Sequence, residues 1–379
     1  MRMTRFTWVA WVWVWSSAAL YAAAEEKPQL DCRAYLGSVE AAAVGQRELA
    51  IGQLRLLEEP FLNEKILTDR GAYRTQALGC IGRAPVRTKR AAALLHLENS
   101  ISYRHEHHAV RSALNQLLAD DLLRGLGRSG GSTAGFAVEG YLALAYSLQG
   151  SAEPATAVDY FEQALRLKPQ LAEAQLGIGT AYEKLGKYQA AQESLAAAVA
   201  INPRLAEAEL RLAMCLERMG DTKGARAALE RTIELTAPRS AAASSATEVA
   251  AKQPARPGET LPAPPFVRQI ALAELGMLEL HRAQFQQAVA LLERALAADP
   301  QEQSTYIALA YAHERCGASD KSVELARRAL RAGDNRRDSF RYLYDLCQVQ
   351  RGAELMDHLW SGLRAEAQSE ATQKLGGAP

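Results

Sequence analysis

The sequence has almost no net charge. Its 44 lysines and arginines balance 43 aspartates and glutamates, which gives a formal charge of +1. Proteins that bind nucleic acid need an excess of basic residues to neutralise phosphates, so we expect no nucleic-acid partner. Hydrophobic residues make up 48% of the chain and charged residues 23%, which is the composition of a folded globular protein.

Long hydrophobic runs are confined to the start of the chain. Two arginines precede an apolar stretch from Phe6 to Leu20, and alanines at 22–24 precede two glutamates. This layout predicts a signal peptide over residues 1–24 that is removed on export. The alternative is an uncleaved membrane anchor, because residues 6–24 just reach the length that spans a bilayer. We expect an exported protein, periplasmic or secreted, with no membrane insertion after signal cleavage.

The sequence lacks a recognisable site for catalysis or cofactor binding. Gly125, Gly127 and Gly130 have the spacing G-x-G-x-x-G, but a dinucleotide site needs a strand before that loop. A helical segment precedes these glycines, so a flexible hinge explains them better. No Ser, Cys, Asp or Glu stands in an arrangement typical of a nucleophile or an acid–base pair. We therefore expect neither enzymatic activity nor a cofactor.

Histidine is scarce, and its one cluster needs an explanation. His105, His107 and His108 could bind zinc or copper, since clustered imidazoles are metal ligands. The zinc-protease pattern requires a second histidine four residues after the first, where Ala109 stands. Solvated polar residues at the start of a helix are the commoner explanation, so we predict no metal site.

Cysteine is also scarce: the chain has five, so at least one is unpaired. Export would place them in an oxidising compartment, where disulfides form. Cys316 and Cys347 fall in the first helices of successive helix pairs and could pair there. Cys32 with Cys80 is the other pairing that the sequence leaves open. Cys215 is expected to be a small buried core residue.

From Phe136 onward, one pattern returns about every 34 residues. Three blocks show it best, at residues 172–203, 206–237 and 269–300. A version with a longer loop covers 136–169, and a looser one covers 303–334. Each block predicts two helices joined by a short turn, around Gly186, Gly220 or Gly317 where a glycine is present.

The pattern resembles the tetratricopeptide repeat. In the block 172–203, Gly179, Ala191 and Ala198 fill the small positions of that family, Tyr182 its frequent tyrosine and Pro203 its closing proline. The resemblance implies an all-α fold, an alpha-alpha superhelix (a tetratricopeptide repeat solenoid) with a helical N-terminal extension.

The physics of helix packing agrees with this resemblance. Two helices cross closely only where one partner has a small side chain, so Ala191 and Ala198 are expected to be contact points. Pro203 cannot continue a helix and therefore ends its pair. A lone pair cannot bury its apolar face, so neighbouring pairs must stack.

The periodicity also divides the chain into regions. They are a signal peptide (1–24), a helical N-terminal region with a possible degenerate repeat (25–130), repeats 1–3 (136–237), a disordered linker of Ala, Ser and Pro (238–265), repeats 4–5 (266–334), and C-terminal capping helices with a tail (335–379).

The resemblance implies a concave groove lined by the first helix of each pair. The predicted partner-binding residues on it are Leu144, Thr180, Lys184, Met214, Arg218, Met277, His281, Tyr311 and Arg315. Some family members clamp a terminal carboxylate with Lys, Asn and Arg. Thr180 and Met214 stand where asparagine would be needed, so that activity is not expected. A floor with methionines instead suits an apolar peptide or helix face.

Two functions are compatible with these features. The first is an exported, non-enzymatic scaffold that binds a protein or peptide in the groove. The alternative is an accessory or regulatory subunit with a metal-responsive histidine cluster in its N-terminal helical region. The sequence does not name the partner, and a fold alone does not determine a function.

Overall fold

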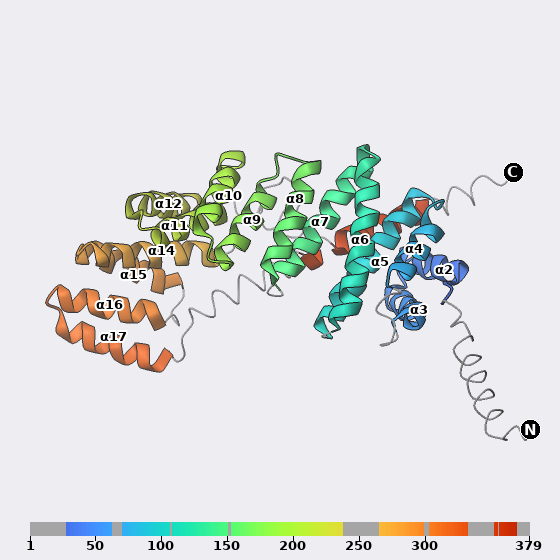
Figure 1. Cartoon of the computed structure of the whole chain (residues 1–379). Coiled ribbons are helices and arrows are strands. Elements are labelled where there is room, and N and C mark those ends of the chain that lie inside the picture. The colour runs from blue at the N-terminus through green and yellow to red at the C-terminus, as the bar shows by residue number, and fades with distance from the viewer. Residues whose placement is uncertain are drawn as a thin grey trace, which may run out of the picture.

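The computed structural model describes residues 28–62, 70–106, 108–150, 153–237, 265–298, 303–332, 352–354 and 356–369. The regular elements within these ranges are all helices, which confirms the all-α fold class (Figure 1). The predicted signal peptide and nearly all of the predicted linker lie outside them. No helix in the described ranges has both the length and the apolar composition needed to cross a bilayer.

Five helix pairs follow one another between residues 131 and 332. They are α7 (Gly131–Gly150) with α8 (Pro154–Leu167), α9 (Ala172–Lys184) with α10 (Tyr188–Ile201), α11 (Ala206–Arg218) with α12 (Thr222–Leu235), α14 (Pro265–His281) with α15 (Phe285–Ala298), and α16 (Gln303–Arg315) with α17 (Ser319–Ala332). Each pair packs against the next, so the predicted repeats form one helical solenoid (Figure 1).

The N-terminal region extends this solenoid. It contains α2 (Cys32–Ala43), α3 (Arg47–Glu58), a 3-10 turn η1 (Glu59–Phe61), α4 (Arg70–Ile81), α5 (Val86–His105) and α6 (Ala109–Arg128). Helices α5 and α6 pack along one another as a further pair, and α6 packs against α7. Helices α2, α3 and α4 close this end by packing on one another and on α5.

Glycines in the left-handed backbone region separate the helices of several pairs. Gly186, Gly220 and Gly317 have φ angles of 71°, 84° and 80°, which residues with a Cβ rarely adopt. The predicted turns at these glycines are therefore confirmed. Asp221 then begins α12, because its side chain accepts a hydrogen bond from the backbone N–H of Gly224.

Small residues stand where helices cross. Ala191 and Ala198 are fully buried, as predicted. A Cβ added at Gly177 would overlap the ring of Phe161 on α8, and one added at Gly179 would lie 2.5 Å from Cγ of Leu195. These large side chains reach their packed positions only because the opposite residue is glycine.

The solenoid continues across the predicted linker. Helix α14 packs directly against α11 and α12. Arg226 of α12 forms an ion pair with Glu279 of α14 at 3.2 Å, and Arg268 donates to the carbonyl of Ile233 at 2.6 Å. The helix pairs on either side of the predicted linker therefore stack directly on one another.

The end of the chain lies far from where the sequence analysis placed it. We expected residues 335–379 to cap the fifth repeat. The described part of that region, residues 352–354 and 356–369 (the C-terminal helix, red in Figure 1), instead packs against α3, α5 and α7. A Cβ added at Gly352 would lie only 3.1 Å from the carbonyl oxygen of Ala143 on α7. An amphipathic pattern shows that a helix needs a partner, but it does not show which one.

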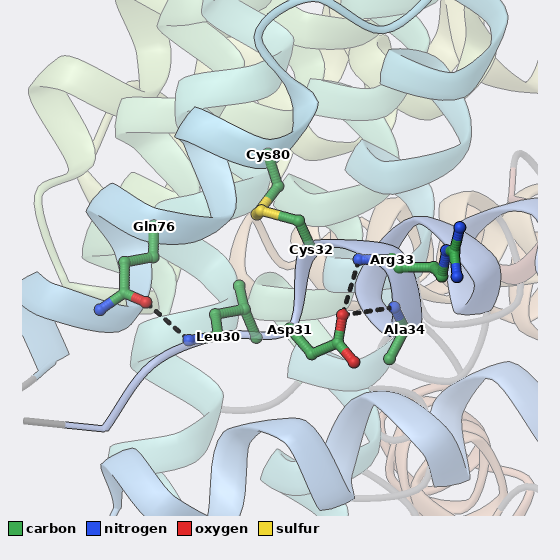
Figure 2. The surroundings of a disulfide bond; sticks show 7 residues. All are labelled: Leu30, Asp31, Cys32, Arg33, Ala34, Gln76 and Cys80. Carbon is green, nitrogen blue, oxygen red and sulfur yellow. Dashed lines mark hydrogen bonds between the residues drawn. A yellow bond between two sulfur atoms is a disulfide. The ribbon is translucent and has the colours of Figure 1, made fainter.

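A disulfide between Cys32 and Cys80 joins the start of α2 to the end of α4 (Figure 2). It confirms one of the two pairings that the sequence left open. Beside it, the backbone N–H of Leu30 donates to Gln76 of α4 at 2.6 Å, and Asp31 caps α2. Covalent and polar contacts thus fix α2 against α4.

The other described cysteines are not bonded. Cys316 is free and exposed, which differs from the pairing with Cys347 that we considered; Cys347 itself lies outside the described residues. Cys215 is buried, as expected, and burial raises the pKa of its thiol to about 12. Such a thiol stays protonated at neutral pH and is unreactive.

The glycines at 125–130 are not a hinge. Gly125 and Gly127 lie inside α6, and a Cβ at Gly127 would approach Leu167 to 3.1 Å. The turn into α7 falls at Gly130 and Gly131, which have φ angles of 72° and 58°. These glycines therefore serve close packing and a tight turn.

A buried chain of polar side chains joins α2, α3, α5 and α6. The Tyr35 hydroxyl donates to Nε2 of His96 at 2.9 Å, and Nδ1 of His96 donates to Oδ1 of Asn115 at 2.7 Å. The same Oδ1 accepts from Asn99 at 3.2 Å, and Asn99 also donates to Glu58 at 3.4 Å. All five residues are fully buried. The network fixes how the four helices pack, because a buried polar group that loses its partner is costly.

Burial shifts two pKa values in this network in opposite ways. It raises the pKa of Glu58 to about 7 and lowers that of His96 to about 4. Between about pH 4.5 and 7 the folded state therefore binds more protons at Glu58 than the unfolded state does, so this contribution to stability falls as pH rises. His96 has the opposite effect between about pH 4 and 6.5.

Replacing Gly177 by alanine should destabilise the solenoid. Although alanine is the better helix former by about 1 kcal/mol, overlap with Phe161 should lower the free energy of unfolding by about 1–3 kcal/mol. Urea unfolding followed by circular dichroism measures this. The control is Gly37→Ala at an exposed position of α2, where an added Cβ meets nothing within 4 Å; it should be neutral or stabilising. Equal losses in both variants would refute the steric explanation.

Replacing Glu58 by glutamine should remove the contribution that falls with pH. Relative to the wild type, the free energy of unfolding of Glu58→Gln should rise between pH 4.5 and 7, by up to about 3 kcal/mol. The complementary variant His96→Gln should lose stability relative to the wild type between pH 4 and 6.5. Urea titrations at a series of pH values test both. A Glu58→Gln difference that is constant with pH would contradict the charge-burial argument.

Candidate partner-binding surface

The first helices of successive pairs lie side by side and form one face of the solenoid. Helices α5, α7, α9, α11, α14 and α16 contact one another in that order. This face, the first-helix surface, is the one that the sequence analysis predicted as a concave groove. The structure gives its two ends different properties.

At its N-terminal end, the first-helix surface is covered. The C-terminal helix crosses α5 and α7, and Gly352 lies against residues 143–147 of α7. Leu144 is fully buried in the same core cluster as Trp360. Leu144 is therefore not open to a partner in this structure, because another part of the chain covers this position.

The middle of the first-helix surface is closed by contacts between repeats. Thr180 is fully buried, and its hydroxyl donates to the carbonyl of Leu176 at 2.8 Å. The prediction that Thr180 binds a partner is wrong for this reason. Lys184 is half-buried, and its Nζ donates to the carbonyl of Gln149 on α7 at 2.9 Å. Its ammonium group holds two repeats together.

An ion pair closes the neighbouring position. Arg211 of α11 bonds to Glu183 of α9 at 2.8 Å, and its side chain is only 6% exposed. Met214, one turn further along α11, is half-buried against the core beneath α12 and α14. Only Arg218, at the end of α11, is exposed. A partner would reach the edge of this region but not its floor.

The C-terminal end of the first-helix surface is open. Tyr311 and Ile307 lie one turn apart on α16 and are 52% and 57% exposed. The Tyr311 ring meets Phe285 of α15 edge-on at 6.4 Å, and the Arg315 guanidinium lies 5.1 Å over the same Phe285 ring. Met277, on the neighbouring first helix α14, is partly exposed. We call these five residues the open surface.

Basic side chains lie along one edge of the first-helix surface. Arg218, His281 and Arg315 are exposed and stand at the last residues of α11, α14 and α16. The partial negative charge of a helix C-terminus favours a cation there. The same placement puts positive charge beside the open surface.

Sequence reasoning missed Ile307 and Phe285. The predicted groove residues on the last first helix were Tyr311 and Arg315, and Ile307, one turn before Tyr311, was not among them. The i, i+4 spacing of Ile307 and Tyr311 was the available signal. Phe285 belongs to a second helix, where no groove residue was sought.

The histidines offer no assembled metal site in the described ranges. His105 ends α5 and His108 precedes α6, and both are exposed; His107 lies outside the described residues. No group of three or more potential ligands is found in the part of the chain that the structure describes.

A cavity of about 410 Å³ opens beside α6, which is the second helix of the α5–α6 pair. Arg104, Ser112, Gln116 and Glu153 are among its lining residues. Its polar side chains bond mainly to the protein: Arg104 donates to Glu153 at 3.1 Å and to Gln116 at 2.9 Å. Ser112 donates to the carbonyl of Ser100. We assign no ligand to it.

Known proteins resemble this chain in repeat pattern and fold. Family models of the tetratricopeptide repeat match residues 148–204, 184–248 and 274–336. No curated protein sequence matches the chain.

Three solved structures that resemble the chain are each less than 20% identical to it. BtubC from P. vanneervenii is 18% identical, with a TM-score of 0.44 over 62% of this chain and 90% of that one. MamA from Desulfovibrio magneticus RS-1 is 17% identical, with a TM-score of 0.40 over 52% and 94%. YrrB, described as a TPR protein with an unusual peptide-binding site, is 17% identical, with a TM-score of 0.38 over 51% and 84%.

The family matches fall on the stacked helix pairs, and the glycines and alanines of the repeat occupy the crossing points in the structure. Residues 148–248 and 274–336 of the chain are tetratricopeptide repeats.

Proposed function

We propose that the protein is an exported, non-enzymatic scaffold that binds a protein or peptide partner on the open surface. Tetratricopeptide repeat proteins generally act by binding protein or peptide partners. The observation that carries the proposal is the exposure of Ile307 and Tyr311 together on one face of α16. Of the other predicted apolar positions on this surface, Leu144 is covered by the chain itself and Met214 is half-buried.

The chemistry of the open surface favours an apolar partner segment. Ile307, Tyr311 and Phe285 supply branched and aromatic contacts, and tyrosine is among the residues that most often dominate binding energies. Met277 adds a flexible thioether that adapts to different shapes. A short helix or extended segment with apolar anchors would bury these side chains.

The charges beside the open surface favour a partner segment that also carries acidic residues. Arg218, His281 and Arg315 form a basic edge along the row, so acidic residues beside the apolar anchors of the partner would face opposite charge. Such exposed charges mainly guide association and orientation, because water and salt screen them.

Two features support export. Residues 1–24 have the basic start, apolar stretch and small-residue cleavage site of a signal peptide. The Cys32–Cys80 disulfide is of a kind that persists in an oxidising compartment and is rare in the cytosol. Periplasmic and secreted locations both satisfy these features.

Loss of an anchor on the open surface should strongly reduce capture of the partner. The bait is residues 25–379, crosslinked in an extract of the cell envelope, with Ile307→Glu and Tyr311→Glu as test variants. Each should reduce capture by about 10-fold or more, since an anchor side chain contributes about 2 kcal/mol. The matched control is Val323→Glu on α17, which is 50% exposed on the second helix of the same pair. Unchanged capture by both test variants would place binding elsewhere.

Export predicts a defined mature terminus. Expressed with its leader in a bacterial host, the protein should begin at Glu25 in N-terminal sequencing and should be recovered outside the cytoplasm. Nonreducing mass spectrometry of the same sample should find the Cys32–Cys80 peptide pair. An intact Met1 terminus in membranes would support the anchor alternative instead.

A further inference from the structure

The C-terminal helix lies in a groove as a helical ligand would. Its buried residues recur at helical spacing on one face: Met356, Leu359, Trp360 and Leu363 are between 1% and 6% exposed. They enter a groove made by α3, α5 and α7, which we call the N-terminal groove. Anchors at i, i+3, i+4 and i+7 are the pattern by which an amphipathic helix binds in a groove.

The groove also recognises polar features of this helix. The Trp360 indole donates to Glu98 of α5 at 3.0 Å, and the guanidinium of Arg47 lies 5.9 Å over the Trp360 ring. Arg47 also pairs with Asp357 at 3.0 Å. Further along the helix, Glu366 pairs with Arg90 of α5 at 3.0 Å. The ligand chemistry is therefore a helix with one buried tryptophan and carboxylates at its edge.

The walls of the N-terminal groove are assembled without the C-terminal helix. The Cys32–Cys80 disulfide fixes α2 to α4, and the buried polar network ties α2 and α3 to α5 and α6. Helices α6 and α7 then pack on one another directly. The groove would thus keep its shape when the helix leaves.

The contacts of the C-terminal helix are also reversible. Residues 352–369 contain no cysteine, so no disulfide holds the helix. Its edge carboxylates stay in water, with Asp357 67% and Glu366 48% exposed. Exposed ion pairs of this kind give orientation more than affinity. Four apolar anchors on a tether are what keep the helix in place.

We propose that the N-terminal groove is a second partner site, specific for an amphipathic helix with a buried tryptophan and acidic edge residues, and that the C-terminal helix occupies it until such a partner helix displaces it. The inference rests on the proposed scaffold function, but it concerns a different surface from the open one. Because the C-terminal helix is covalently part of the same chain, it competes intramolecularly, so weak partners are excluded.

The test uses the full mature chain with a protease site inserted between residues 333 and 351. Cleavage removes the tether while leaving the helix in its groove. The probe is a synthetic, fluorescently labelled peptide of residues 352–369, and anisotropy reports its binding. We expect the cleaved protein to take up the peptide, and the uncleaved protein to bind it about 100-fold more weakly because the tethered copy competes.

Peptide variants test the recognition chemistry. Trp360→Ala should weaken binding by about 30-fold or more, as expected for a buried aromatic anchor. Asp357→Arg should weaken binding to the wild type and recover part of it on an Arg47→Glu protein. The control peptide is Ala365→Ser, at an exposed position of the helix, and it should bind like the native sequence.

Two outcomes would overturn the proposal. One is the absence of exchange in the cleaved protein at a large peptide excess. The other is exchange accompanied by loss of amide protection throughout α2–α6, which would make the helix a permanent part of the core. An Ile307→Glu variant should exchange the peptide normally, so failure of the open surface and failure of the N-terminal groove can be told apart.

Discussion

The fold depends on the close crossing of helices that only small residues permit. Gly177 against Phe161, Gly179 against Leu195 and Gly276 against Leu292 place a bare backbone beneath a large side chain. The contact at Gly177 joins two pairs, and those at Gly179 and Gly276 lie within a pair, so small residues permit both the pairing and the stacking of helices. All first helices consequently fall in one row, which provides the surface that function can use.

The first-helix surface is continuous along the solenoid, but its two ends and its middle differ in chemistry. At the N-terminal end the chain supplies its own ligand, a helix anchored by Trp360. In the middle, the Arg211–Glu183 pair and the hydrogen bond from Lys184 to Gln149 join repeats, and Thr180 is buried. At the C-terminal end, Ile307 and Tyr311 face solvent. A scaffold with this arrangement has one site open at all times and one that is accessible only by competition.

The helix pairs and their turns could be predicted from the sequence, because the repeat register depends on residues that are close together in sequence. The positions of Gly186, Gly220, Ala191 and Ala198 were enough to place turns and crossings. The burial of Leu144 has a different origin: it depends on a helix more than 200 residues away in sequence, and an amphipathic pattern carries no information about the surface it will meet. The prediction for Thr180 was wrong for a local reason, since its hydroxyl donates to a carbonyl of its own helix one turn earlier.

The two ends of the solenoid differ in how their helices are held together. The N-terminal helices carry a disulfide and a continuous buried network from Tyr35 to Glu58, while the described C-terminal pairs are held by apolar packing, with ion pairs mostly at the surface. A groove that must release and recapture a helix has to keep its shape while empty, and a polar network that loses stability when any member is unpaired provides that constraint. The open surface has no such need, since packing against a neighbouring repeat already fixes α16.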